Sequence, residues 1–283
     1  MRTNGAGRDD LRFDFGRNWQ SYLDRAFDDA REETVRRSLV CLTGLADFHG
    51  RAFIDIGCGS GVFSLAAHRL GASVVSLDLD PLSVECCRRV RASAGSPDTW
   101  RVLEGSILDP AIVKQLSPSD IVYSWGVLHH TGQMWTALRA AAVLLAPGGL
   151  LCVALYNKVE SRLTGSDSWL RIKRFYVSSG RTAQAIMKLG YGAYKTATLI
   201  ATIHNPVTVA RAYRQQRGMS LWHDWVDWLG GYPYEYASAG EVFRFGQEEL
   251  GLQLIRLNTT STIGCNEFVF FRPATVASST TPV

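Results

Sequence analysis

The chain has 283 residues, of which 46% are hydrophobic and 20% charged, and its formal net charge is +4. This composition is ordinary for a globular protein and excludes a collagen-like, low-complexity or strongly acidic chain. The first ten residues lack the apolar core of a signal peptide, and no run of about eighteen apolar residues is present. The six cysteines include no C-x-x-C pair, so we expect reduced thiols in a cytoplasmic protein without a membrane span or a metal site.

The N-terminal part combines a polar start with a dense aromatic stretch. Residues 1–10 are expected to be disordered. Beyond them, Trp19, Tyr22 and Leu23 share one face of a predicted helix. Two interpretations of this helix remain open: it packs on the core, or it forms a lid over a ligand. An amphipathic helix is predicted next, over residues 28–45.

The middle of the chain alternates short apolar runs with helical patterns. Predicted strands cover residues 52–56, 73–78, 99–104, 120–125 and 150–156, and predicted helices cover 61–70, 81–94 and 134–145. Asp80 is the expected cap of the helix that begins at Pro81. This alternation predicts a parallel sheet with helices on both faces, whose ligands bind beyond the carboxyl ends of the strands.

The loop after the first predicted strand is almost without side chains. Gly57, Gly59 and Gly61 alternate with small residues, which permits positive φ and lets a ligand approach the backbone. The following helix adds free N–H groups at its N-terminus. About seventeen residues later the second strand ends in Asp78, whose carboxylate can accept hydrogen bonds from both hydroxyls of a ribose. The pattern therefore predicts a nucleoside site.

The same stretch departs from the dinucleotide fingerprint at two positions. G-x-G-x-x-G requires glycine at position 62, where the chain has Val62. Asp55, two residues before the first glycine, would repel a pyrophosphate. Its carboxylate suits a ligand with a cationic end, such as the ammonium of an amino acid.

Asp55, the three glycines and Asp78 together resemble the class I S-adenosylmethionine-dependent methyltransferases. The first motif of that family, D-x-G-x-G-x-G, is matched by Asp55, Gly57, Gly59 and Gly61. The resemblance is nearest to ubiquinone-type and natural-product small-molecule methyltransferases. It implies an α/β, Rossmann-like fold with a seven-stranded, mostly parallel sheet, helices on both faces and an antiparallel last strand. It also implies S-adenosyl-L-methionine as cofactor and S-adenosyl-L-homocysteine as product.

The resemblance further implies where the cofactor contacts lie. Asp55 would approach the ammonium, Asp78 the ribose hydroxyls and Leu79 the adenine. Family members often carry an acid where this chain has Ser106. The candidate contacts for the adenine amine are therefore the Ser106 hydroxyl, the Ile107 backbone and the Asp109 carboxylate. The complete predicted cofactor set is Trp19, Asp55, Gly57, Gly59, Ser60, Gly61, Asp78, Leu79, Ser106, Ile107, Trp125 and Gly126.

Two histidines directly follow the fourth predicted strand. A sulfonium methyl is already electrophilic, so a base is needed only where the acceptor must lose a proton. A neutral imidazole suits that role, although a lone histidine is usually structural. Of His129 and His130 we favour His129, because related enzymes place a polar active-site group at the first of these positions.

Residues 158–236 interrupt the alternation and form a predicted helical cap, with helices at 169–177, 182–201, 206–216 and 221–228. Up to residue 217 the cap carries many cations but only two acids, Glu160 and Asp167. A solvated helical surface explains this charge, and so does binding of an anionic substrate, a carrier protein, a membrane or RNA.

The cap ends in an aromatic loop, Gly-Gly-Tyr-Pro-Tyr-Glu-Tyr, at residues 230–236. Its tyrosines place polar tips on rigid aromatic bodies. We interpret the loop as a wall of the acceptor pocket in which Tyr234 and Glu235 orient the acceptor, with a scaffold role as the alternative. The predicted catalytic set is His129, His130, Glu235 and Tyr22, with no metal ligand.

The predicted organisation has five parts. Ser238 and Glu241 form a capping box for a helix over 238–250, and strands over 252–257 and 268–271 complete the sheet. The parts are a disordered N-terminus (1–10), a cofactor-binding core with N-terminal lid helices (11–157), the cap (158–236), a closing helix with two strands (237–273) and a flexible tail (274–283).

The predicted function is methyl transfer to a small aromatic or heteroaromatic acceptor, of the natural-product or quinone type, by in-line SN2 displacement. The alternatives are an RNA methyltransferase that uses the basic cap, and a cofactor-binding scaffold without activity. We expect a small-molecule partner rather than nucleic acid, and a homo-oligomer is left open.

Overall fold

The computed structural model describes residues 29–162, 164–201, 205, 225 and 228–274. The predicted helix with Trp19 and Tyr22 lies outside these residues, as do the predicted helix at 206–216 and most of the one at 221–228.

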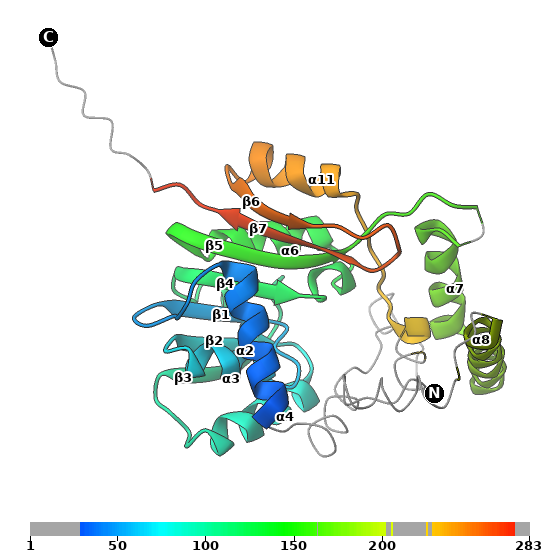
Figure 1. The fold of residues 1–283 in the computed structure, drawn as a ribbon, viewed down its shortest axis with the longest axis horizontal. Helices are drawn as coiled ribbons and strands as arrows, with labels where there is room; N and C mark the ends of the chain where they lie inside the picture. Colours follow the sequence, from blue (N-terminus) through cyan, green and yellow to red (C-terminus); the bar gives the residue numbers. More distant parts are fainter. Residues whose placement is uncertain (1–28, 163, 202–204, 206–224, 226–227, 275–283) are drawn as a thin grey trace, which may run out of the picture.

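A seven-stranded sheet forms the centre of the molecule, in the order β3-β2-β1-β4-β5-β7-β6 (Figure 1). The strands are β1 (Ala52–Ile56), β2 (Ser73–Asp78), β3 (Trp100–Glu104), β4 (Ser119–Trp125), β5 (Leu145–Tyr156), β6 (Gln253–Asn258) and β7 (Cys265–Phe271). β1 to β5 are parallel, and β7 runs antiparallel to both β5 and β6. The predicted sheet, including its antiparallel last strand, is confirmed.

Helices cover both faces of the sheet because each carries one apolar side. They are α2 (Asp29–Thr43), α3 (Val62–Arg69), α4 (Pro81–Ser93), α5 (Pro110–Val113), α6 (Met134–Val143) and α11 (Ala239–Arg244). On one face, Leu39 of α2 and Leu65 of α3 are buried against Phe53 of β1. On the other, Leu138 of α6 and Val242 of α11 belong to a second core cluster.

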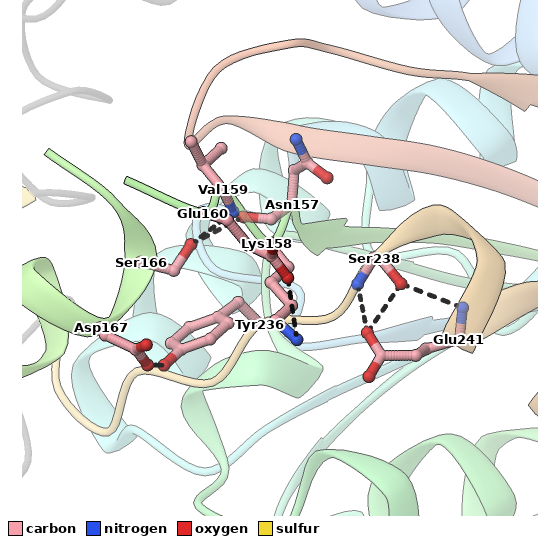
Figure 2. Close-up of polar contacts among 9 residues, drawn as sticks. All are labelled: Asn157, Lys158, Val159, Glu160, Ser166, Asp167, Tyr236, Ser238 and Glu241. Carbon is pink, nitrogen blue, oxygen red and sulfur yellow. Dashed lines mark hydrogen bonds and ion pairs between the residues drawn. The ribbon is translucent and has the colours of Figure 1, made fainter. Parts of the chain in front are cut away.

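Two predicted helix caps are present. Asp80 Oδ1 accepts a hydrogen bond from Leu82 N at 2.8 Å, so α4 begins at Pro81 as expected. Ser238 and Glu241 form a reciprocal capping box at the start of α11 (Figure 2). The helix then continues as a π-helical turn, Phe245–Glu249.

Two predicted boundaries near residue 145 are wrong. α6 ends at Val143 rather than at residue 145, and β5 begins at Leu145 rather than at residue 150. Leu145 already pairs with Ser119 of β4, and the next pair is Ile121 with Leu150. The register therefore shifts at this point, and residues 146–149 are accommodated inside β5. A bulge inside a strand therefore replaces the predicted loop.

Two helices of the chain between β5 and α11 are described: α7 (Ser166–Ser178) and α8 (Arg181–Ala201). They lie beyond one end of the sheet (Figure 1). Asn157 and Ala237 form a β-bridge, so the chain leaves and rejoins the sheet at adjacent points. Among the described helices, none is long and apolar enough to cross a membrane.

Candidate active site

A pocket of about 580 Å³ opens beyond the carboxyl ends of β1, β2 and β4. This volume is in the range of small-molecule binding sites. The predicted site residues that line it are Gly57, Gly59, Asp78, Leu79, Ser106, Ile107, Trp125, Gly126 and His130. Those in the described part that do not line it are Asp55, Ser60, Gly61, His129 and Glu235. Trp19 and Tyr22 lie outside the described residues.

The glycine loop has the backbone conformation expected for it. Gly57, Gly59 and Gly61 have φ values of 76°, 52° and 82°, in the left-handed region that favours glycine. A Cβ on Gly61 would lie 2.9 Å from Cα of Cys87, so this glycine lets the loop pack closely on α4. Gly57 and Gly59 line the pocket, and a Cβ on Gly57 would lie 2.4 Å from the Val127 side chain.

Asp78 closes one wall of the pocket with its carboxylate. Oδ2 accepts a hydrogen bond from Gly59 N, and Oδ1 accepts one from Asp80 N, each at 2.9 Å. Burial raises the pKa of Asp78, and the two backbone N–H groups counteract this shift. The carboxylate is therefore held at the junction of β2 and the glycine loop.

Asp55 ends a buried chain of hydrogen bonds. Trp100 Nε1 donates to Ser76 Oγ at 2.8 Å, Ser76 Oγ donates to Ser64 Oγ at 2.7 Å, and Ser64 Oγ donates to Asp55 Oδ2 at 2.6 Å. The indole can only donate, so it sets the direction of the whole chain toward the carboxylate. Burial raises the pKa of Asp55 to about 7. The side chain is thus engaged beneath the loop rather than in the pocket.

The predicted adenine end contains two of its three candidate contacts. Ser106 and Ile107 line the pocket together with Leu79, which is 46% exposed. Asp109 does not line the pocket, because its Oδ1 accepts a hydrogen bond from Ala111 N and caps α5. A carboxylate contact from Asp109 therefore has no support here.

The end of β4 forms a further part of the pocket lining. Trp125 is 44% exposed, and its Nε1 donates to Glu267 Oε1 at 3.0 Å. Gly126 has a φ of 77°, and a Cβ there would meet nothing within 4 Å. The indole and an open stretch of backbone thus face the pocket side by side.

His130 is the histidine that lines the pocket. Its Nδ1 lies 2.6 Å from the carbonyl oxygen of Pro233. A carbonyl can only accept, so Nδ1 carries the proton and Nε2 is the basic nitrogen of the neutral ring. Burial lowers the pKa of His130 to about 4, partly offset by this hydrogen bond, so the ring is neutral at pH 7.

His129, the histidine favoured from the sequence, lies behind His130. It is fully buried, and its Nδ1 accepts a hydrogen bond from Tyr156 N at 3.2 Å. Its Nε2 therefore carries the proton, and this atom has no hydrogen-bond partner in the described part of the chain. The 3₁₀ turn Leu128–His130 directs the two adjacent side chains differently. Burial holds the pKa of His129 well below its usual value.

Residues 228–237, here termed the return segment, bring the chain back from α8 to the sheet. Tyr232 and Pro233 of this segment line the pocket. The sequence indicated this loop but not these two residues; the Tyr-Pro pair within an aromatic run is the signal that marks them. Tyr234 is 2% exposed. The Glu235 carboxylate accepts from Met134 N at 2.9 and 3.1 Å, at the start of α6.

In the described residues, no three His, Cys, Asp or Glu side chains are grouped so that they could hold a metal ion. The pocket combines the Asp78 carboxylate and glycine backbone, at the ends of β2 and β1, with a neutral histidine and aromatic side chains from the end of β4 and the return segment.

Known proteins resemble this chain through its core. Residues 54–151 match the family model described as "Methyltransferase domain". A ubiquinone biosynthesis O-methyltransferase from Caulobacter sp. (strain K31) is 32% identical over 138 residues, which cover 47% of this chain and 52% of that protein. The corresponding enzyme from Methylobacterium nodulans is 35% identical over 107 residues, 38% of this chain and 41% of that protein. The chain spans about half the length of the curated relatives it matches.

Solved structures resemble a larger share of the chain. Magnesium protoporphyrin IX methyltransferase from Synechocystis PCC 6803, solved with bound SAM, superposes with a TM-score of 0.54 at 12% identity. That alignment covers 95% of this chain and 100% of the other. An O-methyltransferase family protein from Burkholderia thailandensis gives a TM-score of 0.53 at 14% identity, over 87% of this chain and 58% of that one. At such identities the likeness concerns the fold.

Proposed function

We propose that this chain, which carries a class I S-adenosylmethionine-dependent methyltransferase domain over residues 54–151, methylates a hydroxyl group on a small aromatic or heteroaromatic molecule. The observation that carries the proposal is that one pocket is lined by residues from both sides of β1. Asp78 and the glycine loop lie at the ends of β2 and β1, whereas Trp125 and the neutral His130 lie at the end of β4, on the other side of β1; we term these the cofactor end and the acceptor end.

The cofactor end fits S-adenosylmethionine, the cofactor of this type of domain. The Asp78 carboxylate, fixed by Gly59 and Asp80, offers its oxygens to the ribose hydroxyls. Leu79 provides an exposed apolar surface for the adenine, and Ser106 and Ile107 stand at its edge. When bound, the cofactor supplies an electrophilic methyl group on its sulfonium.

The acceptor end favours a flat, uncharged molecule. Trp125, Tyr232 and Pro233 line this end, with His130 and Thr131 as polar groups. Rigid aromatic and proline walls orient a ring and exclude water, which is the main task in a displacement that needs only alignment. This lining supports an aromatic hydroxyl compound rather than a polyanion.

His130 supplies the base that a hydroxyl acceptor requires. Its Nδ1 proton is committed to the Pro233 carbonyl, so Nε2 is the nitrogen that takes the hydroxyl proton as the oxygen attacks in line. A base held neutral at pH 7 needs no prior deprotonation. In this proposal His129 and Glu235 support the site from behind.

The proposal is tested by measuring S-adenosylhomocysteine binding by calorimetry and methyl transfer from labelled S-adenosylmethionine to a panel of phenols and hydroxylated heteroaromatics. We expect turnover with at least one phenolic acceptor. His130→Ala should lower kcat about 10²- to 10⁴-fold, with cofactor affinity within about twofold of wild type. His68→Ala, a histidine outside the pocket, is the control.

Two results would overturn the proposal. Tight binding without turnover on any acceptor, and without effect of His130→Ala, would indicate a cofactor-binding scaffold. Methylation of RNA, with binding that weakens steeply as salt rises, would indicate the basic-cap alternative.

A further inference from the structure

We propose that Lys173 is a positioning residue for His130, and that it acts through the return segment 228–237. The inference rests on the proposed function only for its kinetic consequence. The structural coupling between Lys173 and His130 can be measured whether or not a methyl acceptor is found.

Lys173 is an internal cation on α7. Its side chain is fully buried, and Nζ donates a hydrogen bond to the carbonyl oxygen of Trp228. Nζ also lies 4.1 Å from the centroid of the Trp228 ring and 4.9 Å from that of Tyr234. An apolar side chain would fill the same space without the cost of desolvating a charge. The lysine therefore holds a specific carbonyl rather than merely filling the core.

The carbonyl that Lys173 holds opens the return segment. Five residues further on, the Pro233 carbonyl accepts the Nδ1 proton of His130 at 2.6 Å. Glu235 N then donates to His129 O at 2.9 Å. Tyr236 OH donates to Asp167 at the start of α7 (Figure 2). Lys173 and Asp167 of α7 thus bond the two ends of the return segment. His129 and His130 contact the segment between these two points.

Tyr156 adds a second, side-chain route between the same groups. Its ring centroid lies 5.6 Å from that of Trp228 and 5.1 Å from that of Tyr234. The same ring lies 5.4 Å from His130 and 3.8 Å from His129. A shift of Trp228 therefore reaches the pocket histidine both through the backbone and through packed rings.

The chemical consequence concerns the tautomer of His130. While the Pro233 carbonyl is in place, Nδ1 carries the proton and Nε2 is the basic nitrogen. If the return segment moves, this hydrogen bond is lost and the second tautomer, protonated at Nε2, becomes populated. Nε2 can then no longer accept a proton from the substrate.

The test compares Lys173→Met, which keeps the length of the side chain but removes the ammonium, with Lys188→Met on α8 as the matched control. We expect Lys173→Met to lower kcat/KM at least about tenfold while S-adenosylhomocysteine affinity stays within about twofold. Lys188→Met should leave both quantities unchanged. In a His130→Ala background, Lys173→Met should change kcat/KM no more than about twofold, because the two residues act as one unit.

A readout independent of activity is the ¹⁵N spectrum of the histidine side chains. Wild-type His130 should show a single tautomer protonated at Nδ1, and Lys173→Met should show a mixture. If the wild-type protein methylates no acceptor, the proposed function fails, but this spectrum still decides the coupling. Should Lys173→Met fail to fold, Lys173→Leu, which also removes the donor to the Trp228 carbonyl, takes its place with the same expectations.

Three outcomes would overturn the inference. The first is an unchanged His130 spectrum in the variant. The second is an equal loss of activity with and without His130, which would indicate a general scaffold role. The third is failure of both Lys173 variants to fold while Lys188→Met folds normally.

Discussion

Both carboxylate oxygens of Asp78 accept hydrogen bonds from backbone N–H groups, those of Gly59 and Asp80. The side chain nevertheless lines the pocket. Each oxygen has lone pairs left for a ribose hydroxyl. Asp78→Ala should therefore weaken S-adenosylhomocysteine binding by about 1.5–3 kcal/mol, the range for hydrogen bonds to charged groups. Calorimetry measures this loss. Asp98→Ala, at an exposed turn, is the control, and equal affinities of the two variants would contradict the ribose assignment.

Ser64 is the middle link of the buried hydrogen-bond chain from Trp100 to Asp55. Ser64→Ala removes the donor to Asp55 and leaves the Ser76 hydroxyl proton without its acceptor. Stability should fall by about 1–3 kcal/mol, the cost of unsatisfied buried polar groups. Urea unfolding measures this loss against Ser93→Ala, since Ser93 is exposed and its hydroxyl donates to the Val90 carbonyl of its own helix. A loss of stability no greater than that of the control would show that the hydrogen bonds from Trp100 to Asp55 contribute little to stability.

At the scale of elements, the glycine loop depends on packing as much as on backbone conformation. Gly61 and Gly95 have nearly equal φ values, 82° and 84°. A Cβ would meet the Cys87 backbone at 2.9 Å in the first case and nothing within 4 Å in the second. Gly95→Ala should therefore cost only the left-handed strain, about 1–2 kcal/mol. Gly61→Ala should cost about 1–3 kcal/mol more through overpacking.

Thermal or urea unfolding of both glycine variants isolates the packing contribution. Equal losses of stability would mean that the loop moves away from α4 without cost. In that case the loop would be held only by the conformational freedom of glycine.

Elements bounded by strong local signals could be predicted from the sequence. The predicted ranges of β1 and β2 match the structure, because each is an apolar run that ends at a glycine or at Asp78. β5 could not be delimited in this way. Its extension to Leu145 depends on pairing with Ser119 of β4, which is a tertiary contact. The local sequence at residues 146–149, by contrast, is typical of a turn.

The cofactor end of the pocket followed from the motif, whereas the acceptor end did not. Which of two adjacent histidines faces the pocket is decided by a 3₁₀ turn and by the Pro233 carbonyl, 103 residues away. The capping of α6 by Glu235 is equally non-local. Lys173 gave no sequence signal, because a lysine in a basic helix is normally exposed.

At the scale of the whole molecule, Asp55 makes stability depend on pH. Its pKa in the folded protein, about 7, lies above the ordinary value of 3.8, so the folded state binds this proton more tightly. The corresponding stabilisation is complete below about pH 4 and is lost as the pH rises through about 7. The difference between the two pKa values corresponds to a decrease of about 4 kcal/mol in the free energy of unfolding as the pH rises through this range.

The measurement is urea unfolding of the ligand-free protein at several pH values, compared with Asp55→Asn. The asparagine retains an acceptor for Ser64 but does not titrate. The difference in stability between the two proteins should change with pH in the stated direction. Curves that run parallel from about pH 4 to 8 would refute the shift. His129 and His130, whose pKa values are lowered, contribute equally to both proteins and cancel.

The adjacency of Asn157 and Ala237 has a consequence for synthesis on the ribosome. β1 to β5 are complete once residue 156 has emerged, but β5 obtains its second neighbour only when Cys265–Phe271 follows, more than a hundred residues later. Until then Leu151, Val153 and Leu155 lie on a strand with one unpaired edge, which is a template for aggregation. Nascent chains that stall within residues 158–264 therefore keep this edge of β5 unpaired.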